Sequence, residues 1–204
     1  MEENNLNENI EKNPPAGGEK GFKKYLFFAW ELFKIAIIAL VIVLPIRYFL
    51  FQPFIVKGES MHPNFESGDY LIIDEISYRF SEPERGDVVV FKTDFIPGYS
   101  GQRFIKRIVG LPGETAQIKA GKVYITDNGK TVELSEKYLL DSLETQGDII
   151  ITLKSDQYFV LGDNRQYSYD SRAWGVVPKK DIIGKAFLRI FPVAALSQIS
   201  NPSY

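Results

Sequence analysis

The sequence predicts a mainly β protein: an antiparallel sheet domain with a β-rich insertion, preceded by one apolar helix that crosses a membrane. Three observations lead to this prediction. Only one long apolar stretch is present, and it ends before residue 50. After it, short runs of branched and aromatic residues alternate with glycine, proline and aspartate turns. Beyond residue 55 no helical period is sustained, apart from a short turn at 136–143, which favours sheets or an open barrel.

Composition narrows the range of functions. The chain has 204 residues, a net charge of −2, no cysteine and one histidine. A near-neutral charge gives no reason to expect a nucleic acid partner. The cysteine count excludes disulfides and thiolate metal sites, and a single histidine argues against a zinc site. Composition therefore gives no reason to expect a thiolate or zinc site.

Residues 1–24 are polar and contain Pro14, Pro15, Gly17 and Gly18, so they are predicted to form a disordered tail. Residues 25–50 are predicted to form a transmembrane helix. From Leu26 to Ile46 an α-helix is about 31 Å long, enough for a hydrocarbon core of about 30 Å. Glu31 and Lys34 lie within it, three residues apart, where they partly neutralise one another.

Two alternatives for this segment are a buried helix of a soluble domain and a cleaved signal peptide. Residues 46–56 contain no small-x-small cleavage site, which speaks against the second. The lysines before the segment outnumber the basic residues just after it, Arg47 and Lys57. The positive-inside rule then places the N-terminus in the cytoplasm and residues 50–204 outside.

Short strand-like runs fill the rest of the chain. The expected strands are 70–74, 87–91, 103–109, 122–125, 148–153, 157–161 and 182–190. We expect residues 51–112 and 155–192 to form the main β domain and residues 113–154 to form the insertion. Asp127-Asn-Gly-Lys within the insertion is a strong hairpin signal. Residues 193–204 are expected to be a loose C-terminal tail.

Ser60 is a candidate nucleophile. It lies in Gly-Glu-Ser-Met-His-Pro, residues 58–63, where Gly58 permits unusual backbone angles and Pro63 stiffens the exit. Such a serine is also common in an ordinary turn. The single histidine, His62, is expected to be a turn residue, so a serine hydrolase built here needs another base.

Lys106 is the candidate base. On a strand, Phe104, Lys106 and Ile108 share one face, and this apolar setting implies a buried amine. Burial lowers the pKa of a lysine from about 10.4, and a neutral amine can deprotonate a serine hydroxyl. The alternative is a lysine at a sheet edge whose amine reaches solvent.

Residues 162–175 are dense in turn-forming and hydrogen-bonding side chains directly after a strand. Either they form a polar loop that satisfies its own backbone, or they brace a site. Asp170 and Arg172 are expected to pair.

Four stretches together carry a resemblance: 58–63, 85–91, 104–114 and 162–175, in this order behind one anchor. The chain resembles the type I signal peptidases, membrane-bound Ser/Lys endopeptidases that remove signal peptides from exported proteins. The resemblance implies an antiparallel β catalytic domain, an acyl-enzyme, and no metal or cofactor.

The resemblance also implies roles for single residues. Ser60 would be the nucleophile and its backbone N–H an oxyanion donor, and Lys106 would be the general base. Ser168 would form a hydrogen bond with the lysine amine and orient it, and the pair of Asp170 with Arg172 would hold that loop. Some family members carry serine where this chain has Gly58, so its oxyanion hole is expected to rely on backbone and water.

The family binds its substrate as an added strand, with small apolar pockets for alanine-like residues at the first and third positions before the cut. The residues expected to bind substrate here are Phe54, Ile55, Val56, Gly58, Met61, Phe65, Phe104 and Ile105. The implied partners are secretory preproteins, the lipid bilayer of the cell membrane and, by proximity, the export machinery.

Two rival functions remain open. One is an anchored binding module without catalysis that docks extended peptides. The other is the related group of self-cleaving repressors, which also use serine and lysine. Those repressors carry a DNA-binding helical domain where this chain has a polar tail and an apolar helix.

Overall fold

The structure is a computed structural model that describes residues 18–49, 51–140, 143–202 and 204. The chain divides into two compact units, Met1–Leu44 and Pro45–Tyr204. Most of the predicted tail, residues 1–17, lies outside the described residues.

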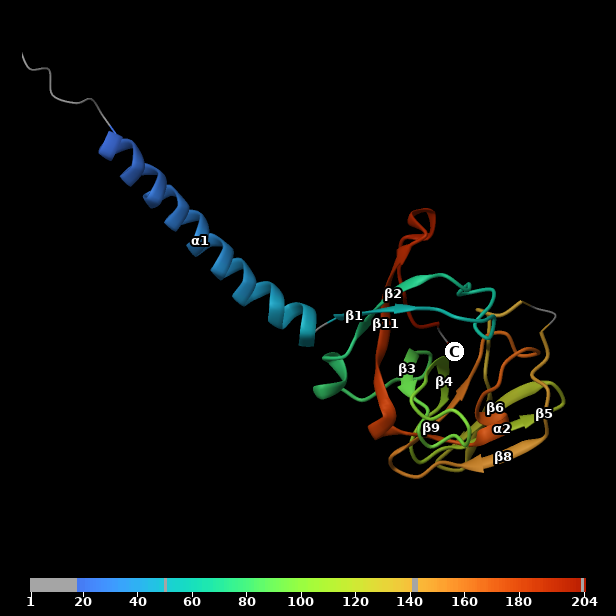
Figure 1. The fold of residues 1–204 in the computed structure, drawn as a ribbon. Helices are drawn as coiled ribbons and strands as arrows, with labels where there is room; N and C mark the ends of the chain where they lie inside the picture. The colour runs from blue at the N-terminus through green and yellow to red at the C-terminus, as the bar shows by residue number, and fades with distance from the viewer. Residues whose placement is uncertain (1–17, 50, 141–142, 203) are drawn as a thin grey trace, which may run out of the picture. The chain divides into compact units, whose positions relative to one another are not determined.

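One long helix, α1 (Gly18–Phe49), precedes the sheets (Figure 1). Its stretch Lys23–Val43 has a mean hydropathy of 2.4 and 21 residues, so it is long and apolar enough to cross a bilayer. Lys34 Nζ lies 2.7 Å from Glu31 Oε1, the predicted neutralising pair. The helix begins earlier than predicted. Residues 18–24, which were assigned to the tail, form its first turns.

The main sheet is antiparallel throughout, as predicted, with strand order β1-β2-β11-β3-β4-β9-β10 and β12 paired to β11. Its strands are β1 (Phe51–Ile55), β2 (Tyr70–Asp74), β3 (Val88–Lys92), β4 (Arg103–Gly110), β9 (Gln157–Leu161), β10 (Val177–Pro178), β11 (Ile182–Phe191) and β12 (Ser197–Gln198).

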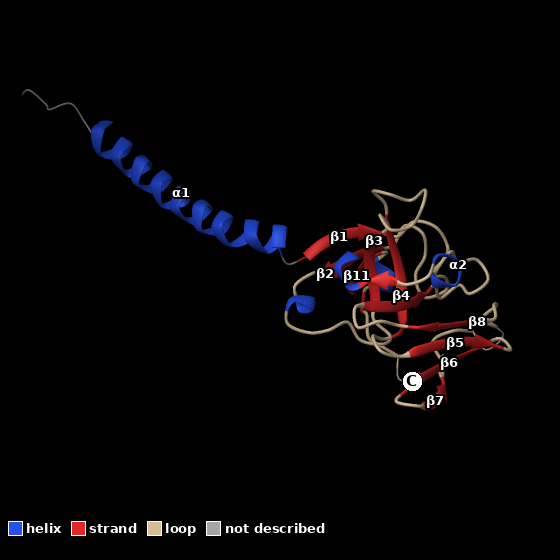
Figure 2. Cartoon of the chain, turned by 90° about the horizontal axis from the view of Figure 1, so that it is seen from below, coloured by secondary structure: helices blue, strands red, loops and turns tan. Residues whose placement is uncertain are grey.

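A second sheet falls inside the predicted insertion and has the order β7-β6-β5-β8. Its strands are β5 (Thr115–Lys119), β6 (Lys122–Asp127), β7 (Lys130–Glu133) and β8 (Ile149–Thr152), which Figure 2 shows grouped apart from β1, β2 and β11. The predicted hairpin joins β6 to β7 through Asn128 and Gly129, both at positive φ. β5 and β7 were not among the predicted strands, because their mixed polar residues give no apolar run.

Four short helical turns complete the fold: η1 (Ser77–Arg79), α2 (Ser171–Trp174), η2 (Lys179–Asp181) and η3 (Val193–Ala195). The Asp170 side chain caps α2 by accepting a hydrogen bond from Arg172 N. A backbone bond of 2.9 Å from Leu139 N to Glu136 O forms a turn where one was predicted.

Strand β4 joins three apolar clusters of the sheet domain. Ile105 packs with Val56, Met61 and neighbours in the first, and Val109 in the second. Ile108 and the half-buried Phe104 pack in the third. Neighbouring residues of β4 therefore enter different clusters, as strand alternation predicts, and the strand carrying Lys106 is held on both faces.

The C-terminal segment is packed, contrary to the expectation of a loose tail. β12 pairs with β11, and Ile199 N donates to Phe187 O at 2.9 Å. Asn201 Nδ2 donates to the buried Asp87 Oδ1 at 2.9 Å. These contacts use the free edge of a neighbouring strand and a buried carboxylate, neither of which the polar local sequence reveals.

Candidate active site

Ser60 lies in a turn that follows β1. Gly58 has φ +84°, a conformation that favours glycine, and His62 N donates to Glu59 O at 3.1 Å. The turn is tied to a distant loop, because Asn164 N donates to Ser60 O at 3.0 Å and Asn164 Nδ2 donates to Glu59 O at 3.0 Å. The Ser60 N–H takes part in none of these bonds.

The structure brings Lys106 to Ser60. Lys106 is only 4% exposed, and its Nζ lies 2.7 Å from Ser60 Oγ across 46 residues of sequence. The amine also donates to Ile105 O at 2.9 Å and lies 5.4 Å from the Phe104 ring centre. The hydroxyl is therefore within proton-transfer distance of a buried amine.

Burial lowers the pKa of the Lys106 amine to about 8, against the opposing attraction of the Asp170 and Asp163 carboxylates. A large fraction of the amine is then neutral in mildly alkaline solution. A neutral amine has a lone pair that can accept the Ser60 hydroxyl proton, which a charged ammonium cannot do. This geometry supports nucleophilic chemistry at Ser60.

The predicted hydrogen bond between Ser168 and Lys106 does not form. Within the described residues, Ser168 Oγ is buried without a hydrogen-bond partner, and the amine is directed to Ser60 and Ile105 instead. Ser168 does lie near the site. A Cβ placed on Gly162 would be 2.1 Å from Ser168 Oγ and 2.4 Å from Ser60 O, so only glycine allows the two loops this close an approach.

The predicted ion pair of Asp170 and Arg172 is present. Arg172 Nε and Nη2 each donate to the fully buried Asp170 carboxylate at 2.8 Å. Asp170 also accepts from Gly162 N at 3.0 Å, and Arg172 Nη2 reaches Ser168 O at 3.4 Å. The pair therefore fixes the backbone on both sides of Ser168.

Two ion pairs that were not predicted from the sequence hold the same loop, one of them buried and the other partly buried. Arg107 Nε and Nη2 donate to Asp163 at 2.8 and 2.6 Å, across 56 residues of sequence. Arg165, 1% exposed, pairs with Glu136 at 2.5 and 2.8 Å. Asp163 and Arg165 stand in the singled-out stretch 162–175, but nothing in a single sequence indicates their distant partners.

A cleft of about 540 Å³ surrounds the pair of Ser60 and Lys106. Five of the expected substrate-binding residues line it: Phe54, Ile55, Gly58, Phe104 and Ile105. The other three, Val56, Met61 and Phe65, lie in the core with exposures of 1%, 0% and 2%. Their side chains fill the first apolar cluster, so they support the cleft from below.

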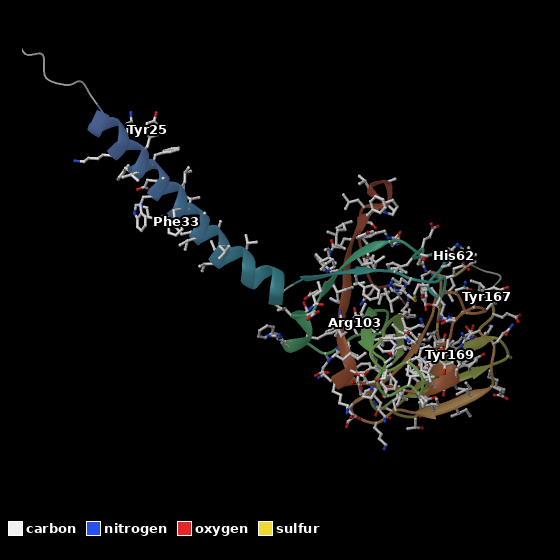
Figure 3. The ribbon with its side chains drawn as sticks, viewed as in Figure 1. Tyr25, Phe33, His62, Arg103, Tyr167 and Tyr169 are labelled. Carbon is white, nitrogen blue, oxygen red and sulfur yellow. The ribbon has the colours of Figure 1, made fainter. Side chains whose placement is uncertain are left out.

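Several residues that line the cleft were not predicted from the sequence to bind substrate: Lys57, Glu59, Tyr99, Gln102, Arg103, Tyr167 and Tyr169. Arg103, Tyr167 and Tyr169 are labelled in Figure 3, as is His62, which is exposed and not part of the lining. Most of the missed residues belong to loops that only the fold brings to the cleft.

Two strand edges border the cleft. β3 pairs with β4 over residues 103–107, whereas β9 pairs with β4 only from Arg107 onward. Within the described residues, 103–106 therefore have a strand on one side only. β1 likewise pairs with β2 alone. Unpaired backbone groups at such edges accept an additional extended peptide.

Known proteins are similar to this chain over most of its length. The family model described as signal peptidase, peptidase S26, matches residues 29–191. A probable signal peptidase I-2 of Synechocystis is 39% identical over 173 residues, 84% of this chain and 77% of that protein. The signal peptidase I of Leptolyngbya laminosa is 40% identical and covers 81% of each chain.

The signal peptidase I of Bacillus amyloliquefaciens is 35% identical over 190 residues, 88% of this chain and 94% of the relative. The family match thus includes part of the helix, the Ser60 turn, β4 and the 162–175 loop. The chain belongs to the signal peptidase I family, peptidase S26, the serine endopeptidases that remove signal peptides.

Proposed function

We propose that Ser60 and Lys106 form the catalytic dyad with which this signal peptidase cuts preproteins. The observation that carries the proposal is the 2.7 Å approach of a buried amine to the Ser60 hydroxyl. The lowered pKa of that amine supports the same assignment, because a base must be neutral to accept a proton.

In the acylation step, neutral Lys106 takes the Ser60 proton as Oγ attacks the scissile carbonyl carbon. The tetrahedral intermediate collapses, the C–N bond breaks, and the ammonium gives its proton to the departing amine. Ser60 then carries the signal peptide as an ester. In deacylation a water gives a proton to the same amine as its oxygen attacks the ester carbon. The C–Oγ bond then breaks, the ammonium returns the proton to Ser60 Oγ, and the signal peptide leaves with a free carboxyl end.

The negative charge on the carbonyl oxygen needs hydrogen-bond donors during both steps. The backbone N–H of Ser60 is the proposed donor, supported by its absence from the hydrogen bonds that hold the turn. Gly58 brings no hydroxyl, so water is the proposed second donor. A single donor of this kind contributes about 3 kcal/mol in other hydrolases.

The substrate is proposed to bind as an extended strand between the free edge of β1 and the free edge of β4 at residues 103–106. The apolar side chains of Phe54, Ile55 and Ile105 would form the walls for small residues before the cut. Main-chain hydrogen bonds would supply affinity and the walls specificity.

The N-terminal helix anchors the chain in a membrane. We place this anchor in the cell membrane, with the N-terminus cytoplasmic and the catalytic domain on the outer face near the export machinery. The lysines before the span, Lys20, Lys23 and Lys24, support this orientation. Enzyme and signal helix would then share one bilayer, which raises their effective concentration.

The test is cleavage of a preprotein by the detergent-solubilised full chain, with the cut mapped by mass spectrometry. We expect one cut after a small-x-small sequence, and none with Ser60→Ala. Ser81→Ala, at an exposed serine outside the cleft, is the matched control and should cut as the wild type does. Cleavage retained by Ser60→Ala would contradict the proposed nucleophile.

A further inference from the structure

Three aromatic rings from separate segments form a continuous ladder on one wall of the cleft. Tyr99 and Phe104 meet edge to face, with ring centres 5.3 Å apart. On its other side Tyr99 meets Tyr169 at 5.3 Å, with an interplanar angle of 31°. Phe104 also contacts the buried Phe91 at 6.3 Å, so the ladder is anchored in the core.

Hydrogen bonds hold the segments that carry these rings. Thr93 Oγ1 donates to Tyr99 O at 2.5 Å, and Tyr99 N donates to Ile96 O at 3.1 Å. Tyr169 directly precedes Asp170, whose carboxylate is buried in its ion pair. The rings are therefore arranged before any ligand arrives, which limits the entropy lost on binding.

The ladder begins beside the reacting groups. Alternation along β4 puts Phe104 on the same face as Lys106, and the ring centre is 5.4 Å from the amine nitrogen. Ile105 points to the opposite face and packs in the first apolar cluster. The two sides of β4 therefore offer a peptide two different surfaces, an aliphatic one and an aromatic one.

The outer end of the ladder is open to a ligand. Tyr169 is 43% exposed, and Tyr167, also on the cleft lining, is 75% exposed (Figure 3). Exposed aromatic faces that line a cleft gain free energy when an apolar side chain covers them, and a ring adds a stacking contribution. An acidic side chain would lose hydration against these ring faces and would gain no stacking contribution in return.

We propose that Phe104, Tyr99 and Tyr169 form a substrate subsite for an apolar or aromatic side chain of the preprotein. This proposal rests on the proposed function. The subsite is separate from the walls for small residues. Tyr169 contacts that side chain, and Tyr99 also positions the Tyr169 ring. Because side chains of an extended peptide alternate in direction, the subsite acts on one substrate position while both neighbours point toward the Ile105 side.

The experiment uses the detergent-solubilised full chain and a set of synthetic signal-peptide substrates. In each, one position from the fourth residue before the cut to the second after it is alanine, phenylalanine or aspartate. The readout is the ratio of kcat/KM for the phenylalanine peptide to that for the alanine peptide, taken within each enzyme. This ratio is independent of the amount of folded enzyme.

We expect the wild type to show a ratio of about 5 to 20 at one position, with aspartate disfavoured there, a range that one apolar contact supplies. Tyr169→Ala and Tyr99→Ala should bring the ratio close to one, and Tyr169→Phe should keep it. Tyr124→Ala, at a half-buried tyrosine in β6 outside the cleft, is the matched control and should keep the wild-type ratio.

Cleavage by the wild type with no preferred position, or a preference that survives Tyr169→Ala and Tyr99→Ala, would overturn the subsite and leave the peptidase function standing. If the wild type cut none of the peptides and no preprotein, the proposed function and the subsite would both fail.

Discussion

Lys106 Nζ lies 2.7 Å from Ser60 Oγ, and the two groups differ in their exposure to solvent. Lys106 belongs to a strand buried on both faces, whereas Ser60 belongs to a turn beside an open cleft. The amine is thus shielded from water while the hydroxyl remains reachable by a peptide.

The pH dependence of catalysis should reflect the amine. Its pKa is lowered to about 8, and only the neutral form accepts the Ser60 proton. We expect kcat/KM to rise as the pH increases through about 8 and to level off above it. Steady-state kinetics with a peptide substrate across this range measures the effect. A rise of kcat/KM centred near the ordinary lysine pKa, about 10.4, would mean that the amine is exposed in solution.

Replacing Lys106 by methionine should abolish activity and stabilise the fold. Methionine fills the same space without the cost of burying a charge. Below pH 8 the native protein bears the full cost, about 3 kcal/mol for a shift from 10.5 to about 8. Between these two values the unfolded chain holds more protons than the folded one, so wild-type stability rises with pH.

The stability gain of Lys106→Met should therefore be largest at pH 7 and vanish above about pH 10.5. Urea unfolding at several pH values measures it. Lys119→Met, at an exposed lysine in β5, is the control and should change stability little. A Lys106→Met protein less stable than the wild type at pH 7 would argue against a destabilising buried ammonium.

Gly162→Ala should inactivate the enzyme. The new Cβ would lie 2.4 Å from Ser60 O and 2.1 Å from Ser168 Oγ, so the Ser60 turn must move. Overpacking of this kind costs about 1–3 kcal/mol of stability, and a displacement of about 1 Å at a reacting group lowers rates about 100-fold.

Gly129→Ala is the control. Gly129 lies in the hairpin at φ +78° with no atoms near its Cβ position, so this substitution strains the backbone without touching the site. It should lose stability while kcat/KM stays within about twofold. Equal activity losses in both variants would contradict this explanation.

Asp170→Asn should weaken the brace and shift the pH profile. The Asp170 charge raises the pKa of Lys106, so its removal should move the alkaline limb of kcat/KM to lower pH. The positive charge of Arg172, no longer paired with Asp170, would also lower the pKa of Lys106. Breaking such a pair also costs about 3–5 kcal/mol of stability. A limb that stays in place, measured on variant protein confirmed to be folded, would show that Asp170 does not act on the amine.

Much of the fold was predictable because it depends on local patterns. Apolar length predicted α1, and branched runs predicted β2, β3, β4, β9 and β11 of the main sheet, but not β1, β10 or β12. The Asn-Gly turn predicted the hairpin of β6 and β7. Errors arose where local sequence is silent. β5 and β7 have no apolar run, and residues 197–201 pack through contacts with β11 and Asp87.

The candidate site was likewise predictable only in part. Residue types and order singled out Ser60, Lys106 and the pair of Asp170 with Arg172. The structure places Ser60 and Lys106 on the cleft and shows the pair holding the loop 162–175. Sequence could not show that Ser168 Oγ lacks a bond to the amine, because that depends on where the amine points. It also could not show the pairing of Arg107 with Asp163.

The sequence by itself determined which groups are available: a hydroxyl shortly after the anchor, a lysine in an apolar strand, a pair of opposite charges in the loop 162–175, and no thiol. Only the tertiary structure decided which of them touch, which are buried, and which aromatic rings stand beside the reacting pair. The physical reason is that the pKa of Lys106 and the approach of Tyr99 to Tyr169 depend on desolvation and packing. These effects arise only when segments far apart in the chain are brought into contact.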